Sequence, residues 1–330
     1  MKSHLIQYFI GHRGQRDLPS WSRWAPAPLL LRAAKSRRAA GWYDTRTLAL
    51  FRRNWVRRRS KSSLLDYAMF RRDLGLSLAQ SHGTYLNDIL EKLSLRQRRA
   101  ALNLLIEAGM SGITHADAHS SESHFVRAMQ SVWRAEFAEG LRRHGDKGIC
   151  VVGNGGNLLG AGLGQFIDSH GTIVRFNQYS GIESTSNDLG QRTDLLVISP
   201  DFNGFVPAGI KWLVISGPDM AFKMKEWQRF SMPLHTGVKV LTVPLQPWHE
   251  LVSQIQAPPS AGLLFLCWIR SLLCSWAGIQ AIGFGFARNS RVPYHHANPK
   301  HASAERHNWP AELVLLSRWK KEGLNIELSV

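Results

Sequence analysis

Cysteine is scarce in this chain, and long apolar runs are missing from it. Its 330 residues include three cysteines, Cys150, Cys267 and Cys274. Three scattered cysteines in apolar surroundings are too few for a disulfide framework or a metal cluster, so we expect all three to be core residues. No stretch reaches the roughly 20 apolar residues that span a bilayer, and the start lacks a signal-peptide pattern. These absences predict a protein made and kept in the cytoplasm.

Acidic residues are scarce at the front of the chain. The formal net charge is +17, and fourteen arginines and lysines between residues 13 and 61 face only Asp17 and Asp44. Aromatic side chains beside basic ones suit an anionic membrane surface, so residues 1–60 are predicted to bind the inner face of the membrane. A solvated basic surface is the plain alternative, and nucleic acid is the less favoured partner. The tryptophans among these charges are Trp21, Trp24, Trp42 and Trp55.

Helical patterns follow the basic block. Apolar residues recur at helical spacing over residues 64–78, 85–110 and 121–143, which predicts helices there. The stretch 112–121 is rich in Ser, His, Asp and Ala and is typical of a loop between domains. We therefore divide the chain into a basic, largely helical N-terminal region, residues 1–120, and a second domain, residues 121–330.

A glycine-rich turn opens the second domain. The apolar run at residues 149–152 ends at Gly153 and predicts a short buried strand. The next residues, Asn154, Gly155 and Gly156, allow backbone N–H groups to approach a phosphate. Residues 159–169 then have near-helical apolar spacing, and residues 172–176 are typical of a second strand. A dinucleotide fingerprint fits poorly, because Leu158 stands where its third glycine belongs and Arg175 where its acid belongs.

Further apolar runs continue this alternation. They lie at residues 194–199, 212–217, 238–243 and 279–284, separated by turns and helical patterns. Such alternation predicts an α/β fold with a doubly wound, mostly parallel, Rossmann-like sheet. Ligands bind beyond the carboxyl ends of the strands in such sheets. The Asn154 loop and residues 283–285 are both expected at that edge.

Two more groups of polar residues stand near the end of the chain. Ser260 precedes an apolar helical run, 263–273, and a serine at a helix start followed by free backbone N–H groups is a weak anion-site signal. Paired histidines, His295 and His296, follow Tyr294, and His307 precedes Glu312 by five residues. Histidine pairs in a basic protein are commonly surface residues, so pattern alone assigns them no chemistry.

These motifs together resemble glycosyltransferase family 29, the animal-type sialyltransferases. The stretch 150–193 resembles the large sialylmotif, with Gly155 and Ile182 as mild departures. Ser260, Ala261 and Gly262, with the helix and Gly-Phe-Gly that follow, resemble the small motif, and the histidine pair and the His307 to Glu312 segment resemble the third and very small motifs. The large-motif matches are Cys150, Gly153, Asn154, Gly156, Asn157, Leu158, Gly160, Gly162, Gly164, Gln165, Ile167, Asp168, Ser169, His170, Arg175, Asn177, Gly181, Glu183, Asp188, Gly190, Arg192 and Thr193.

The resemblance implies a fold and an activity. The fold is the sheet-based, GT-A-like architecture of this family, and the activity is the transfer of sialic acid from CMP-sialic acid to a hydroxyl of a glycan or a lipid-linked saccharide, with inversion and without a cofactor or metal. Animal members carry an N-terminal membrane anchor, so its absence points to a bacterial member. The family also pairs its large-motif cysteine, here Cys150, with one in the small motif, for which Cys274 is the nearest candidate.

The same resemblance implies which residues form the site. His307 is the expected general base, since histidine has a pKa near working pH, and His296 or His295 is expected to stabilise the departing phosphate. Two alternatives stay open: a transferase for another CMP-sugar such as CMP-Kdo, and a non-enzymatic membrane- or nucleic-acid-binding protein. The residues expected at the donor nucleotide are Asn154, Gly155, Gly156, Asn177, Ser260, Ala261, Gly262 and Glu312.

Overall fold

The chain folds into two compact units. The computed structural model describes residues 20–108, 110, 121–143, 147–177, 185–218, 227–284 and 304–328. Unit 1 comprises Met1–His119, Trp248–Pro259 and Glu305–Trp309, and unit 2 comprises Ser120–Pro247, Ser260–Ala304 and Pro310–Val330. Two short segments from the second half of the sequence therefore belong to unit 1, whereas the sequence-based division into 1–120 and 121–330 assigned them to the second domain.

Unit 1 is built from helices. The single helix predicted over residues 85–110 is wrong, because Ser94 and Gln97 start a new helix there: the Ser94 N–H and hydroxyl both donate to Gln97 Oε1, at 3.3 and 3.0 Å, as in a capping box. The helix predicted over 64–78 corresponds to α4 (Lys61–Asp73). In chain order the elements are η1 (Ser20–Arg23), α2 (Ala27–Ala39), α3 (Thr45–Arg58), α4 (Lys61–Asp73), α5 (Gln80–Asp88), η2 (Leu90–Lys92) and α6 (Leu95–Glu107).

A buried ion pair holds the start of α3. Asp44 accepts from Arg37 at 2.5 Å and caps the helix by accepting the Thr47 N–H at 2.8 Å. Arg37 and Arg46 are 0% and 4% exposed, so part of the basic block serves the interior of unit 1 and not its surface. Among the described residues, no helix has both the length and the apolarity required to cross a membrane.

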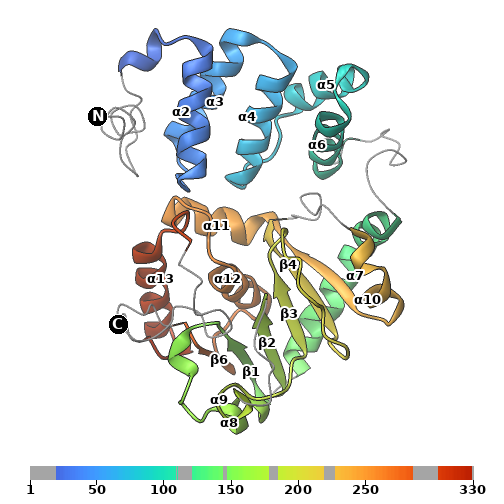
Figure 1. Cartoon of the computed structure of the whole chain (residues 1–330), viewed down its shortest axis with the longest axis vertical. Coiled ribbons are helices and arrows are strands. Elements are labelled where there is room, and N and C mark those ends of the chain that lie inside the picture. Colours follow the sequence, from blue (N-terminus) through green and yellow to red (C-terminus); the bar gives the residue numbers. More distant parts are fainter. Residues whose placement is uncertain are drawn as a thin grey trace. The chain divides into compact units, whose positions relative to one another are not determined.

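Unit 2 contains a seven-stranded sheet in which all neighbouring strands are parallel (Figure 1). The order is β5-β4-β3-β2-β1-β6-β7, so the chain runs outward from β1 to β5 and returns to β6 on the other side of β1. The predicted doubly wound parallel sheet is confirmed, and its winding direction reverses at β1. The strands are β1 (Ile149–Val152), β2 (Thr172–Phe176), β3 (Leu195–Ile198), β4 (Trp212–Pro218), β5 (Lys239–Val243), β6 (Ile279–Ile282) and β7 (Asn325–Ile326).

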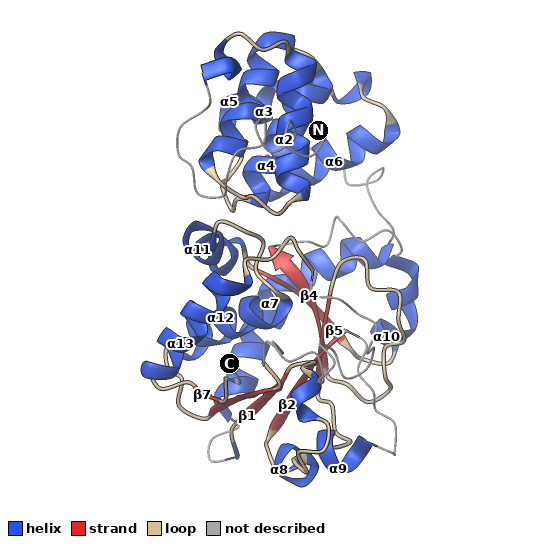
Figure 2. Ribbon diagram, turned by 60° about the vertical axis from the view of Figure 1, so that its left-hand side comes forward, coloured by secondary structure: helices blue, strands red, loops and turns tan. Residues whose placement is uncertain are grey.

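Helices cover both faces of this sheet (Figure 2). On one face, α7 (Ser121–Arg143) meets α12 (Ala261–Leu273) where Phe137 stacks on Trp268 at 5.1 Å. The other face carries η5 (Gly156–Leu158), α8 (Gly164–Asp168) and α9 (Ser186–Leu189). Leu158, Ile167 and Leu189 from these short elements join one apolar cluster with β1, β2 and β6. The remaining elements of unit 2 are η8 (Trp227–Phe230), α10 (Ser231–His235) and, from Pro310 onward, α13 (Trp309–Lys321), whereas α11 (Leu245–Ile255) belongs to unit 1 from Trp248 onward.

Two details correct the sequence-based expectations. The helix predicted over 159–169 begins only at Gly164, because Gly160 and Gly162 adopt positive φ angles of 79° and 64°, which an α-helix does not allow. Cys274 was expected in the core, but it is exposed at the end of α12, where its φ angle is 56°. Cys150 and Cys267 are buried, as expected, and none of the three cysteines forms a disulfide.

Candidate active site

The candidate site begins where the loop after β1 meets the end of β6. The Gly155 N–H donates to the Gly283 carbonyl at 3.0 Å. A Cβ atom on Gly155 would lie 2.7 Å from that oxygen, and one on Gly153 would lie 2.4 Å from it. Any other residue would push the two backbones apart. The contact lies at the point where the winding of the sheet reverses, which is the usual ligand position in open α/β sheets.

Two asparagines lie at the carboxyl ends of β1 and β2. Asn154 Nδ2 donates to the Phe176 carbonyl at 2.9 Å, while its Oδ1 is buried without a hydrogen-bond partner among the described residues. Asn177 has a positive φ angle of 47°, and its Oδ1 accepts the Ser199 N–H at 2.8 Å. An unpaired buried acceptor costs about 1–3 kcal/mol, so a ligand N–H or O–H donating to Asn154 Oδ1 would be favoured.

A carboxylate holds the far end of the same loop. Asp188 accepts the N–H groups of Gly160 and Gly162, at 2.7 and 2.9 Å. These two hydrogen bonds lower the pKa of Asp188. The loop is therefore fixed at one end by β6 and at the other by Asp188. The residues between these two anchors include Gly156 and Asn157.

Neighbouring charged residues also serve the framework. Asp168 accepts the backbone N–H groups of Gln191 and Arg192 at 2.9 and 3.0 Å. The Arg192 side chain donates to the carbonyls of Asp168 and His170, at 2.7 and 2.8 Å. Arg175 is buried in β2 and donates to the Leu189 carbonyl at 2.6 Å. The sequence identified Asp168, Arg175 and Arg192 as matches to the large motif, but it did not show that their side chains bind the backbone of neighbouring segments.

Ser260 and Glu312 hold one another. Glu312 accepts the Ser260 N–H at 2.8 Å and its hydroxyl at 2.6 Å, and the Ser260 hydroxyl accepts the Leu263 N–H at 3.3 Å. Glu312 is 1% exposed. Burial raises its pKa to about 7, against the opposing effect of the bonds from Ser260. Glu312 was predicted to lie at the donor nucleotide, and both of its carboxylate oxygens contact Ser260. Ala261 and Gly262 are the first residues of α12.

His307 belongs to unit 1 and has a defined ring orientation. Its Nδ1 lies 2.8 Å from the Pro258 carbonyl. A carbonyl only accepts, so Nδ1 must carry the hydrogen, and Nε2 of the neutral ring bears the lone pair. The ring also lies 5.0 Å from that of Trp309. His295 and His296, the predicted phosphate partners, lie outside the described residues.

The structure thus brings two pairs of predicted site residues together. Asn154 reaches the strand end that carries Asn177, and Ser260 pairs with Glu312. In the part of the chain that the structure describes, no three side chains of His, Cys, Asp or Glu gather as a metal site. Metal independence stays a prediction.

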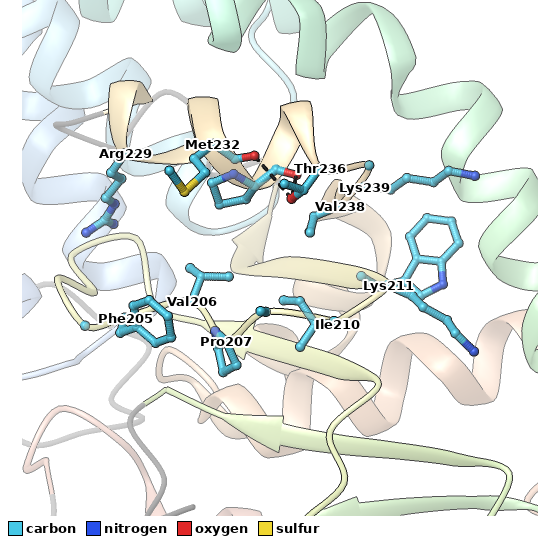
Figure 3. A pocket seen from close by; sticks show the side chains of 16 residues that line it. Phe205, Val206, Pro207, Ile210, Lys211, Arg229, Met232, Thr236, Val238 and Lys239 are labelled. Carbon is cyan, nitrogen blue, oxygen red and sulfur yellow. Dashed lines mark hydrogen bonds between the residues drawn. The ribbon is translucent and has the colours of Figure 1, made fainter.

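A cavity of about 710 Å³ lies elsewhere in unit 2 (Figure 3). One wall is the loop between β3 and β4, with Phe205, Val206 and Ile210, and α10 contributes Met232 to the other. The cavity borders the amino ends of β4 and β5, and none of its lining residues is a predicted site residue. It is therefore not the site at the carboxyl ends of β1 and β2.

Comparison with known proteins identifies relatives of part of the chain. Residues 107–205 match the model of glycosyltransferase family 29 (sialyltransferase). The mouse and rat proteins named CMP-N-acetylneuraminate-beta-galactosamide-alpha-2,3-sialyltransferase 2 are each 28% identical over 168 residues. That alignment covers 44% of this chain and 45% of each relative. The chain thus matches under half the length of these curated relatives.

Two solved structures of a mammalian sialyltransferase are also similar. Each is 19% identical in sequence to this chain, and the alignment covers 55% of this chain and 68% of the solved one. The TM-scores are 0.41 for one and 0.39 for the other, which is a complex with Gal-beta-1-3GalNAc-ortho-nitrophenol. The family model covers Asn154, Asn177 and Asp188, whereas Ser260, His307 and Glu312 lie beyond it.

Replacing Asp188 should loosen the loop after β1. In Asp188→Asn the charged acceptor for Gly160 and Gly162 is lost, so the amides of both glycines should exchange with deuterium several-fold faster. Hydrogen-exchange mass spectrometry of this segment measures the change. The exposed Asp201, changed to Asn, is the matched control. Equal exchange in both variants and the parent would show that Asp188 does not fix the loop.

Glu312 should make the stability of the protein depend on pH. The folded protein holds the Glu312 proton more tightly than the unfolded chain, since its pKa is raised from 4.5 to about 7. The free energy of unfolding should therefore be higher below the unfolded pKa and fall as pH rises through the folded pKa, by up to about 3 kcal/mol.

Urea unfolding at about pH 5 and about pH 8 measures this difference. The side chain in Glu312→Gln cannot ionise. The decrease in the free energy of unfolding between these two pH values should therefore be smaller in the variant, by up to about 3 kcal/mol. Glu327→Gln, at an exposed position, should keep the parental pH dependence. An unchanged pH dependence in Glu312→Gln would contradict the assignment.

Proposed function

Because the chain belongs to glycosyltransferase family 29 (sialyltransferase) through residues 107–205, we propose that it transfers a sialic acid from CMP-sialic acid to a hydroxyl of a glycan. The observation that carries this proposal is the unpaired, buried Oδ1 of Asn154. This acceptor lies within the matched segment, beside a glycine loop and next to β2, whose last residue, Phe176, precedes Asn177. An acceptor near backbone donors suits the hydroxyl, amino and phosphate groups of a nucleotide.

His307 is proposed as the general base. An acceptor hydroxyl must lose its proton as it attacks the anomeric carbon, and a neutral histidine with its lone pair on Nε2 can take that proton. The bond from Nδ1 to the Pro258 carbonyl supports this role, because it favours that tautomer and fixes the ring. Attack opposite the departing CMP gives inversion at the sugar.

The departing phosphate is proposed to meet protein donors. Negative charge builds on CMP as the glycosidic bond breaks, and preorganised N–H and O–H groups stabilise such charge. The amino end of α12, with the backbone N–H groups of Ala261 and Gly262, is one suitable donor set. His296 or His295 is the proposed cationic partner. With these donors no metal ion is needed, and Glu312 acts by holding Ser260.

The donor identity has one close alternative. The proposed contacts address the nucleotide and its phosphate, which CMP-Kdo and other CMP-sugars share. The names of the mouse and rat relatives specify CMP-N-acetylneuraminate, which favours a sialic acid donor. For the acceptor we propose the class of glycans and lipid-linked saccharides.

Release of CMP from the two donors should decide among these possibilities. Purified full-length protein is incubated with CMP-sialic acid or CMP-Kdo, with and without candidate glycans and lipid-linked saccharides, and CMP is measured by chromatography. We expect acceptor-stimulated release from CMP-sialic acid that EDTA leaves essentially unchanged. A strict Mg²⁺ or Mn²⁺ requirement would contradict the mechanism. Tight binding of the protein to nucleic acid without turnover of either donor would favour the non-enzymatic alternative.

Replacing His307 should separate chemistry from binding. His307→Ala should lower kcat about a hundred- to ten-thousand-fold, because positioned proton transfer is lost, while CMP still binds. His235→Ala is a matched control, since His235 Nδ1 also lies beside a backbone carbonyl, that of Ser231, at 2.6 Å. If His307 were only structural, its variant would melt at lower temperature while the folded fraction turned over normally.

Asn154→Ala should behave differently from His307→Ala. Its amide is proposed to contact the nucleotide both before and during the reaction, so the variant should weaken CMP binding as well as turnover. Calorimetric titration with CMP and initial rates on the same preparation measure the two effects. Asn325→Ala, at an exposed position of β7, is the control.

A further inference from the structure

The surface of unit 1 carries a compact group of basic and apolar side chains. It is formed by Arg23, which ends η1, by Trp24, which follows it, and by the carboxyl-terminal half of α3 with Arg59, and we define it as the Trp24 patch. Trp24 is 84% exposed and Val56 is 52% exposed. The exposed arginines with them are Arg23, Arg52, Arg57, Arg58 and Arg59.

Hydrogen bonds hold Trp24 beside the end of α3. The Arg57 guanidinium donates to the carbonyls of Arg23 and Ala25, the residues on either side of Trp24. One turn earlier, Arg53 donates to the Ser22 hydroxyl at 2.5 Å. Segments more than 30 residues apart in sequence are thereby joined. Trp24 is therefore held in solvent next to a cluster of cations and not on a loose terminus.

In the part of the chain that the structure describes, no acid forms an ion pair with the five exposed arginines of this patch. Between residues 20 and 65 the sequence has one acid, Asp44, which is buried with Arg37. Desolvation lowers the pKa of Arg53, and repulsion from Arg23 and Arg57 lowers it further. The dipole of α3 favours cations at its carboxyl end. The arginines there still repel one another, and a bound anion would reduce this repulsion.

The structure distinguishes Trp24 from the other tryptophans of the basic block, of which Trp21 is only partly exposed. Trp42 lies against the buried Arg37, whose guanidinium carbon is 4.6 Å from the ring centroid. Trp55 stacks on Tyr67 at 5.7 Å. These two rings serve packing within unit 1. Among the described residues, the membrane-binding prediction for residues 1–60 thus centres on Trp24, the exposed tryptophan, and its adjacent arginines.

We propose that the Trp24 patch binds the surface of an anionic lipid bilayer. Arginines bind lipid phosphates, and an exposed tryptophan prefers the headgroup layer, where its ring is buried and its N–H stays hydrated. Val56 adds apolar area on the face of α3 that also carries Arg52, four residues earlier. A nucleic acid would engage the arginines but would gain little from Val56. This binding is independent of the proposed transfer reaction.

Vesicle sedimentation of the full-length protein tests the proposal. Vesicles of phosphatidylcholine alone are compared with vesicles in which about one-third of the lipid is phosphatidylglycerol. We expect binding to the anionic vesicles only, weakened by salt. The variant Arg52→Gln/Arg58→Gln removes two charges without touching the bonds of Arg57, and should lose about fivefold in affinity for each arginine, roughly 25-fold in total.

Matched controls distinguish the patch from the net charge. Lys320→Gln/Lys321→Gln removes two exposed charges from α13 and should bind as the parent does. Trp24→Ala should weaken vesicle binding several-fold, whereas Phe205→Ala, at a residue 82% exposed, should not. Equal losses from the arginine and lysine pairs would overturn the proposal in favour of general electrostatics.

A nucleic-acid arm completes the test. Trp24→Ala should leave binding to a short DNA duplex unchanged while it weakens binding to vesicles. If the duplex binds more tightly than the vesicles and the arginine pair governs only the duplex, the patch is a nucleic-acid surface and the proposal is wrong. Circular dichroism of each variant confirms that the affinities compare folded proteins.

Discussion

The closeness of two backbone segments is the constraint on which the candidate site depends. Where the loop after β1 meets the end of β6, a Cβ atom would lie 2.4 Å from the Gly283 oxygen at Gly153 and 2.7 Å from it at Gly155. Glycine is therefore required at both positions. Asn154 lies between them, and its side chain reaches Phe176 at the end of β2. The two strand ends are thus joined at the point where the sheet reverses its winding.

Charged residues near this point mostly hold other protein groups. Asp188 and Asp168 accept backbone N–H groups, and Arg192 donates to backbone carbonyls. Glu312 is committed to Ser260. Among the residues that the structure describes here, the groups that these contacts leave for a ligand are the Asn154 amide oxygen and backbone N–H groups. Charged side chains that bind the protein itself, with polar groups left for the ligand, support a mechanism that relies on preorganised hydrogen-bond donors.

The sequence predicted the parallel sheet well, because six strands are short apolar runs that end at turns. It failed where glycines at 160 and 162 adopt positive φ angles and shorten the following helix. The contact of Ser260 with Glu312 joins positions 52 residues apart, and no local pattern reveals such a contact. The exposed Cys274 was missed because its apolar neighbours belong to α12, while Cys274 itself ends that helix.

We place the nucleotide at the carboxyl ends of β1 and β2, and hydrogen exchange with and without saturating CMP tests this placement. We expect CMP to slow exchange in residues 153–162 and around Asn177, at the carboxyl ends of β1 and β2. No protection there, with protection confined to residues 204–211 and 229–239 around the cavity, would contradict the account.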